Sequence, residues 1–236
     1  MLSPRRYDLS EAEAVYFEHV AATCCPFLAP AHQSGLVSFF RCSLNAGTVE
    51  AAQEALTLAL VVHTEHFRER RRRATGRTAA LLCDNVVVLL PNLRRNQHKA
   101  VLELPHWYCK VMYTSDAILF GKFWTGERDI AKDGSPLPIP PLTFVSLRSA
   151  VRTLDGRFFH RAGELRPDFD TAAPSEQSPL MTHAELRSIH ETVARSIEST
   201  AKADPLDIAE ELAETGAYEA MRIARHNKEE SLAKIA

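Results

Sequence analysis

The sequence predicts an α+β protein in which a mixed β-sheet is covered by helices. The chain has 236 residues, of which 45% are hydrophobic, so it is long enough to bury a large core. Short apolar segments typical of strands alternate with longer segments typical of helices. After an N-terminal helix the expected order is strand, helix, strand, helix, strand and strand. This order favours an α+β sandwich with the helices on one face of the sheet.

The N-terminal segments predict a helix, a loop and a strand. Asp8 or Ser10 can cap a helix whose first turn is acidic, and Pro26 ends that helix. Residues 26–35 (PFLAPAHQSG) then predict a loop. Residues 36–44 (LVSFFRCSL) are rich in β-branched and aromatic residues and predict a strand.

A long helix and a buried segment are expected next. A turn at residues 45–48 supplies the cap of a helix that ends at Gly76. Residues 78–91 (TAALLCDNVVVLLP) form an apolar run that predicts one or two buried strands. Residues 93–113 predict another helix.

The rest of the core is expected to consist of two strands that are separated by a long loop. Residues 117–124 (AILFGKFW) and 142–151 (LTFVSLRSAV) predict the strands, and residues 125–141, dense in proline, glycine and charge, predict the loop. We therefore expect a core domain of residues 1–165. A linker and a C-terminal helical extension, residues 166–236, would follow and pack on the core or join two copies in a homodimer.

Composition and absent motifs exclude several classes of function. The formal net charge of −2 gives no field that favours nucleic acid or an anionic membrane. No apolar run reaches the ~20 residues that a membrane-spanning helix needs. The N-terminal residues lack the apolar region of a signal peptide, and the five cysteines follow no disulfide or zinc pattern, so we expect a cytoplasmic protein. A phosphate-binding glycine loop, a Rossmann fingerprint and a nucleophile elbow are missing too.

The most unusual stretch is QHKAVLELPHWYCKVMY, residues 97–113. At helical spacing, His98, His106 and Cys109 fall on one broad stripe, and imidazole and thiolate both ligate transition metals and haem iron. Pro105 is expected to kink this helix or to start a second one. The alternative is structural, with His98 on the surface and His106 in the core.

A second histidine pair lies in the long helix. His63 and His66 are one turn apart with Glu65 beside them, but no third metal ligand follows at a fixed spacing. We therefore expect a solvated helix face here. The arginine run at residues 70–73 is expected to be a solvated helix C-terminus that interacts favourably with the helix dipole.

Two single residues are also candidates for a site. Cys25 could be a thiolate ligand or a nucleophile if a neighbour lowered its pKa, and a buried structural thiol is the alternative. Arg148 lies on an apolar strand and needs a partner, either an internal carboxylate or the carboxylate of a bound ligand. Asp155, followed by glycine, predicts a turn.

Several spaced motifs resemble those of a family of mostly uncharacterised bacterial proteins. That family has CPF near the start, then FG.F with a Pro/Gly-rich loop, and then a P.P…R..V..D..F pattern; here the likeness covers residues 25–159. The matching residues are Cys25, Pro26, Phe27, His98, Lys110, Phe120, Gly121, Phe123, Pro138, Pro140, Arg148, Val151, Asp155 and Phe158. More distantly, the chain is similar to YqcI/YcgG-type haem proteins, some of which N-oxygenate amino acids. A histidine that often follows the arginine of the family is Ser149 here, so no role is carried over for it.

The resemblance implies a haem- or iron-dependent oxidative enzyme that acts on a small amino-acid-like or nitrogenous metabolite in natural-product biosynthesis. A histidine of the 93–113 helix, His98 or His106, would ligate the metal. Lys110 and Arg148 would hold carboxylates of cofactor or substrate. The apolar walls of the cofactor site would come from Trp107, Phe120 and Phe123.

Two other functions remain open from the sequence. A cofactor-free protein would bind a small molecule or assist a biosynthetic enzyme, and it would have a cavity with apolar walls and one arginine anchor. A cysteine-based hydrolase or transferase would use Cys25, although the sequence singles out no base for it.

Overall fold

The computed structural model describes residues 5–113, 116–130, 134–151 and 155. In this part of the chain, one mixed sheet has the strand order β1-β2-β3-β5-β4. The strands are β1 (Arg5–Arg6), β2 (Val37–Ser43), β3 (Cys83–Leu89), β4 (Ile118–Phe123) and β5 (Phe144–Ser149). β2 and β3 are parallel and the other neighbours are antiparallel. The α+β class is therefore confirmed, and the expected 166–236 extension lies outside the described residues.

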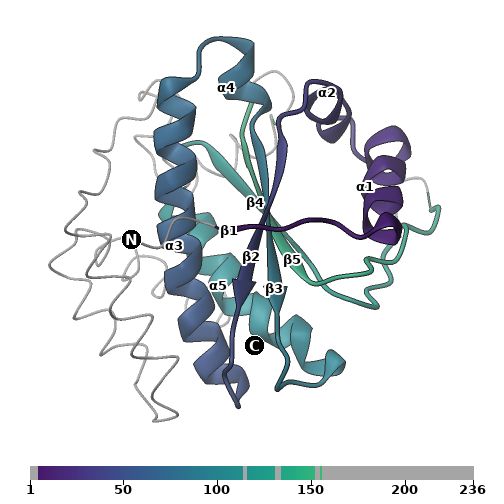
Figure 1. The fold of residues 1–236 in the computed structure, drawn as a ribbon, viewed down its shortest axis with the longest axis vertical. Coiled ribbons are helices and arrows are strands. Elements are labelled where there is room, and N and C mark those ends of the chain that lie inside the picture. The colour runs from purple at the N-terminus through teal and green to yellow at the C-terminus, as the bar shows by residue number, and fades with distance from the viewer. Residues whose placement is uncertain (1–4, 114–115, 131–133, 152–154, 156–236) are drawn as a thin grey trace, which may run out of the picture.

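The helices lie on both faces of the sheet, not on one face as predicted (Figure 1). They are α1 (Glu11–Thr23), α2 (Leu28–Gln33), α3 (Val49–Arg73), α4 (Arg77–Leu81) and α5 (His98–Met112), with a short 3-10 turn at Arg95–Gln97. The long helices α3 and α5 pack together on one face, and α1 and α2 lie across the other. The reason lies in β3, whose consecutive valines are buried on both faces and need a cover on each side.

Two cores of unequal size result from this arrangement. The larger one joins α3, α5 and the sheet, with Leu56, Leu60 and Leu102 fully buried. The smaller one, which we call the α1 core, consists of Phe17, Val87, Leu142 and Phe144. Because α1 buries only Phe17 and Ala21, it is held by far less apolar contact than α3.

Several local predictions differ from the structure. The segment 26–35, expected as a loop, contains α2, and the segment 78–91 begins as α4 before it becomes β3. α5 is one helix that contains Pro105, because packing against α3 and β4 holds it together despite the missing backbone donor. No helix in the described part of the chain is long and apolar enough to cross a membrane.

Candidate functional site

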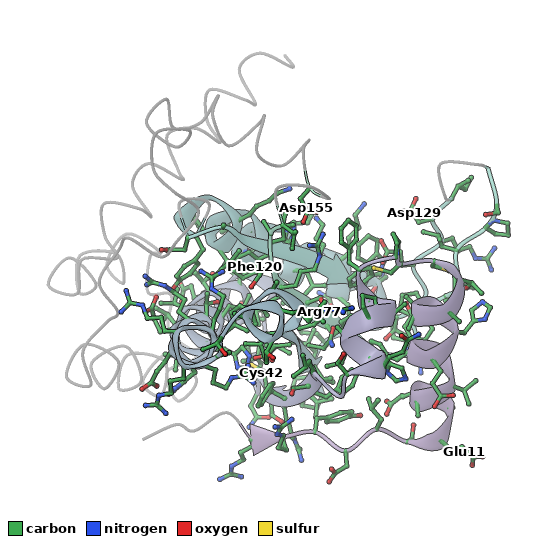
Figure 2. The ribbon with its side chains drawn as sticks, turned by 90° about the horizontal axis from the view of Figure 1, so that it is seen from above. Glu11, Cys42, Arg77, Phe120, Asp129 and Asp155 are labelled. Atoms are coloured by element: carbon green, nitrogen blue, oxygen red, sulfur yellow. The ribbon has the colours of Figure 1, made fainter. Side chains whose placement is uncertain are left out.

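A cavity of about 440 Å³ lies on the face of the sheet that α1 and α2 cover. Its floor is formed by β3, β5 and β4, and one wall comes from α1 and the turn into α2. The loop between β4 and β5 forms the other wall, and Figure 2 shows that Asp129 of this loop lies on the same side of the sheet as α1. This volume is typical of sites that hold a small organic molecule.

The polar residues of the floor are neighbours because of the strand register. Asn85 on β3 is opposite Ser146 on β5, which is opposite Gly121 on β4. In the next row on the same face, Cys83 is opposite Arg148. Since side chains alternate between the faces of a strand, these residues share the cavity face, whereas Asp84 and Val86 point to the α3 side.

Asn85 provides a buried donor on the floor that has no partner in the part of the chain that the structure describes. Its side chain lines the cavity, the residue is 2% exposed, and its Nδ2 atom has no hydrogen-bond partner among the described residues. Leaving such a buried donor unsatisfied costs about 1–3 kcal/mol. A ligand atom that accepts a hydrogen bond would remove this cost.

Arg148, by contrast, has an internal partner. Its Nη1 and Nη2 atoms donate to the two carboxylate oxygens of Asp155 at 2.8 and 2.7 Å, and Nη1 also donates to the Ser149 carbonyl. Its guanidinium lies 4.0 Å from the ring centre of Phe27. Of the two partners expected for Arg148, the structure contains the internal carboxylate.

Asp155 was expected to form a turn with Gly156, which lies outside the described residues; the structure shows Asp155 as the partner of Arg148. Burial alone would raise the pKa of its carboxyl, but hydrogen bonds from Arg148 and from the Val151 N–H outweigh burial and hold the pKa below its ordinary value. The ion pair thereby holds the Asp155 carboxylate against Arg148 at the cavity floor.

The walls of the cavity are mainly aromatic. The rings of Phe123 and Phe144 are stacked with their centres 4.6 Å apart, and Phe17 packs edge-on against Phe144 at 5.1 Å. Tyr16 adds a phenol whose pKa is raised to about 12, first by burial and then by the nearby charges of Glu127 and Cys24. These rings offer flat apolar surface above a polar floor.

The loop side of the cavity carries acidic groups. Glu127 and Asp129 both line it, together with Lys122 of β4. Burial raises the pKa of Glu127 most, and the charge of Asp129 adds to this, while a hydrogen bond from the Trp124 backbone opposes both. Lys122 lies 3.7 Å from Glu103 of α5, so part of its charge is compensated.

Three thiols also line the cavity, namely Cys24, Cys25 and Cys83. Burial raises the pKa of Cys83 to about 12, and its Sγ lies 3.7 Å from the Ser146 hydroxyl, so Cys83 remains a protonated thiol at neutral pH. Cys24 and Cys25 are half-buried at the turn between α1 and α2. The predicted cysteine-based activity of Cys25 stays a prediction, although its place at the cavity is now known.

The predicted site residues divide between the two faces of the sheet. Arg148 and Phe123 line the cavity; Phe120 does too, although its side chain belongs to the larger core. His98, His106 and Lys110 lie on α5, which packs against α3 and β4, and they do not line this cavity. Trp107 is also on α5, and its side chain lies outside the described part of the structure.

Both α5 histidines have protein partners. His98 Nδ1 is 2.8 Å from the Thr143 hydroxyl, and burial lowers the pKa of its imidazole. His106 Nε2 donates to the Phe120 carbonyl at 3.0 Å, and burial lowers its pKa to about 4. A haem or iron ion bound through either of these nitrogens would have to displace the hydrogen bond. Haem or iron dependence stays a prediction.

The expected solvated histidine pair on α3 is wrong for His63. This residue is buried, and its Nε2 lies 2.8 Å from Asp84, which also accepts a hydrogen bond from Arg70. The arginine run is likewise only partly solvated, because Arg71 donates to the Asp116 carbonyl. Among the described residues, no group of three or more His, Cys, Asp or Glu side chains could hold a metal ion.

Sequence reasoning missed Asn85 and the loop acid Glu127. The signal for Asn85 was the dipeptide Asp84-Asn85 inside an otherwise apolar run, since polar residues in a buried strand need partners or a function. Asp84 has protein partners on the α3 side, and Asn85 faces the cavity.

Comparisons with protein-family models, with curated proteins and with solved structures give no match for this chain. The likeness to the CPF-containing family stays a prediction.

Proposed function

We propose that this protein binds a small organic molecule in the cavity between α1 and the sheet. The observation that carries the proposal is the Asn85 Nδ2 atom, which has no hydrogen-bond partner among the described residues and lies in a cavity of about 440 Å³. Binding sites for small molecules combine apolar walls with a few convergent polar groups. Here Phe17, Phe123 and Phe144 supply the walls, and Asn85 and Ser146 supply the polar groups.

The arrangement favours the cofactor-free alternative over the haem enzyme. That alternative expects apolar walls and one arginine anchor; Phe123 supplies a wall, and Arg148 lines the cavity but is paired with Asp155. The histidines that the haem hypothesis needs lie on α5, where they bond to Thr143 and the Phe120 carbonyl. An assisting role beside a biosynthetic enzyme is compatible with such a binding site.

A fluorescent probe tests the proposal directly. We expect 1-aminoanthracene, a flat and uncharged dye, to bind the protein saturably with a rise in fluorescence. Ser146→Phe places a ring in the cavity and should weaken this binding at least tenfold. The matched control is Ser43→Phe, at an exposed position at the end of β2, which should leave binding unchanged. Equal binding by the two variants would place the dye elsewhere and remove this support, and no binding by the unmodified protein would count against the proposal.

The haem-dependent oxidation of an amino-acid-like metabolite is tested separately. The purified protein is mixed with haemin, and its absorption spectrum and iron content are measured. A Soret band that His98→Ala or His106→Ala removes, with the fold intact, would favour that activity. If both variants only lower thermal stability, the histidines are structural.

A further inference from the structure

We propose that the ligand of this cavity is neutral or positively charged and presents a hydrogen-bond acceptor to Asn85. It is not an anion held by Arg148. The inference rests on the proposed function and specifies the chemical class of the ligand.

Arg148 is the cation at the floor of the cavity, and its charge is balanced within the protein. Both oxygens of Asp155 bind its guanidinium at 2.7–2.8 Å, so the pair is neutral as a unit. Three of the five guanidinium N–H groups are used within the described residues, two on Asp155 and one on the Ser149 carbonyl. The N–H groups that remain can donate to a neutral acceptor. An incoming carboxylate would compete with Asp155, whose buried charge would then lose its partner.

The loop side of the cavity carries negative charge. Glu127 and Asp129 line the cavity there. Apart from Arg148 on the floor, Lys122 is the one basic residue of the described lining. Lys122 is itself close to Glu103, with its Nζ 3.7 Å from the carboxylate. An anionic ligand would therefore meet negative charge as it enters, whereas a cationic group would be attracted.

Small side chains leave open space on the floor beside Asn85. Across the floor from Asn85 lie Ser146 and then Gly121, which has no side chain. A Cβ atom at Gly121 would come within 3.0 Å of the Phe123 ring, so glycine lets this ring lie close over the floor. Phe123 in turn stacks on Phe144. A planar ligand that lies along these rings can direct a carbonyl oxygen at the Asn85 Nδ2 atom.

Three probes of nearly equal shape separate the ligand classes. In slightly acidic buffer they are 3-phenylpropanamide, which is neutral, phenylalaninamide, which is a cationic amide, and 3-phenylpropanoate, which is an anion. Binding to the full chain is followed by NMR, with the backbone signal of Gly121 and the side-chain amide signal of Asn85 as reporters of the cavity. We expect both amides to shift these signals with dissociation constants at least tenfold lower than that of the carboxylate.

A matched pair of variants tests the role of the amide. Asn85→Leu removes the donor at similar volume and should weaken binding of 3-phenylpropanamide at least fivefold. Asn92→Leu makes the same change at an exposed amide that bonds to the Asn45 carbonyl, and it should leave binding unchanged. If Asn85→Leu does not fold, the shift of the Asn85 amide signal in the unmodified protein decides the point.

The outcomes distinguish this inference from the proposed function. If the carboxylate binds as well as the amides, or if Asn85 is unaffected by bound amide, the ligand class is wrong and the binding cavity stands. The same holds if 1-aminoanthracene enters the cavity while none of the three probes does. If neither the dye nor any probe reaches it, the proposed function fails together with the inference.

Discussion

At the scale of single residues, Asn85 and Arg148 are polar groups on a buried sheet that are accommodated in opposite ways. Arg148 donates hydrogen bonds to Asp155 within the protein, and the carboxylate neutralises its charge. The Nδ2 atom of Asn85 has no hydrogen-bond partner in the described part of the chain. Because an unpaired buried donor lowers stability, its presence in a cavity is best explained by a ligand that accepts from it.

The Arg148–Asp155 pair leads to a first prediction. Asp155→Asn should lower the free energy of unfolding by about 3 kcal/mol, the low end for breaking a buried pair, because it leaves Arg148 without a counter-charge. Glu69→Gln changes the exposed Arg73–Glu69 pair in the same way and should cost less than about 1 kcal/mol. Urea denaturation of both variants measures the difference. Equal and small effects would mean that the pair is weak and that Arg148 is available to a ligand.

The same pair predicts a dependence on pH. The folded-state pKa of Asp155 lies below its ordinary value of 3.8, so its stabilising contribution is present above about pH 4. This contribution is lost as the pH falls through the folded-state pKa. Asp155→Asn should remove that part of the acid sensitivity, and a variant that keeps it would show that other carboxyls are responsible.

At this scale the sequence predicted that a polar residue requires a partner better than it predicted which residue the partner is. A guanidinium on an apolar strand has to be paired, so the requirement of Arg148 for a carboxylate followed from the strand pattern. Asp155 was expected only to form a turn because it precedes a glycine, and the strand register that brings the two together is a tertiary property. Asn85 was hidden inside a segment whose valines dominate the pattern.

At the scale of elements, α5 determines which groups meet the two histidines that look like metal ligands. Their helical spacing was predicted, but the spacing alone does not say which element faces them. α5 packs against α3 and covers β4, where His106 binds the Phe120 carbonyl. Its imidazole therefore donates to a backbone carbonyl of β4, the strand at one edge of the sheet.

His106 gives the second prediction. Its pKa is lowered from 6.5 to about 4 by burial, so the unfolded chain binds a proton there that the folded chain does not bind between these values. Stability that is complete above pH 6.5 should fall as the pH decreases, by about 1–2 kcal/mol at pH 5. His106→Gln should flatten the stability profile between pH 7 and 5.

The control for this prediction is His19→Gln. His19 is exposed on α1, where it lies near Thr23, and its replacement should leave the profile unchanged. A profile of His106→Gln that matches the unmodified protein would mean that the pKa of His106 is the same in the folded and the unfolded chain, so that burial does not lower it.

At the scale of the whole molecule, the class of fold followed from the order of the elements, but the number of layers did not. Parallel pairing of β2 with β3 and the central place of β3 bury that strand on both faces. The order of the elements does not say which face each helix covers, and α2 itself was not expected because it is short and contains Pro30 in a segment that resembles a loop. The cavity could not be predicted either, since it lies between this second layer and the sheet.

The unequal cores predict unequal local stability, which is the third prediction. α1 buries Phe17 and Ala21, whereas α3 buries 13 residues, so α1 and α2 should open more often than α3 and α5. In native-state hydrogen exchange, the amides of α1 should exchange at least tenfold faster than those of α3. Phe17→Ala should accelerate exchange in α1 and α2 further, because an apolar side chain of the α1 core is lost.

Leu60→Ala is the matched test on the other face. Leu60 is fully buried in α3, so its truncation should lower the protection of the whole sheet by about 2–5 kcal/mol and not that of one layer. A ligand in the cavity touches both α1 and the sheet. It should therefore raise the exchange protection of α1 in Phe17→Ala above that of the same variant without ligand. If α1 instead exchanges only with global unfolding, the α1 layer is an integral part of the core, and access to the cavity requires no opening of that layer.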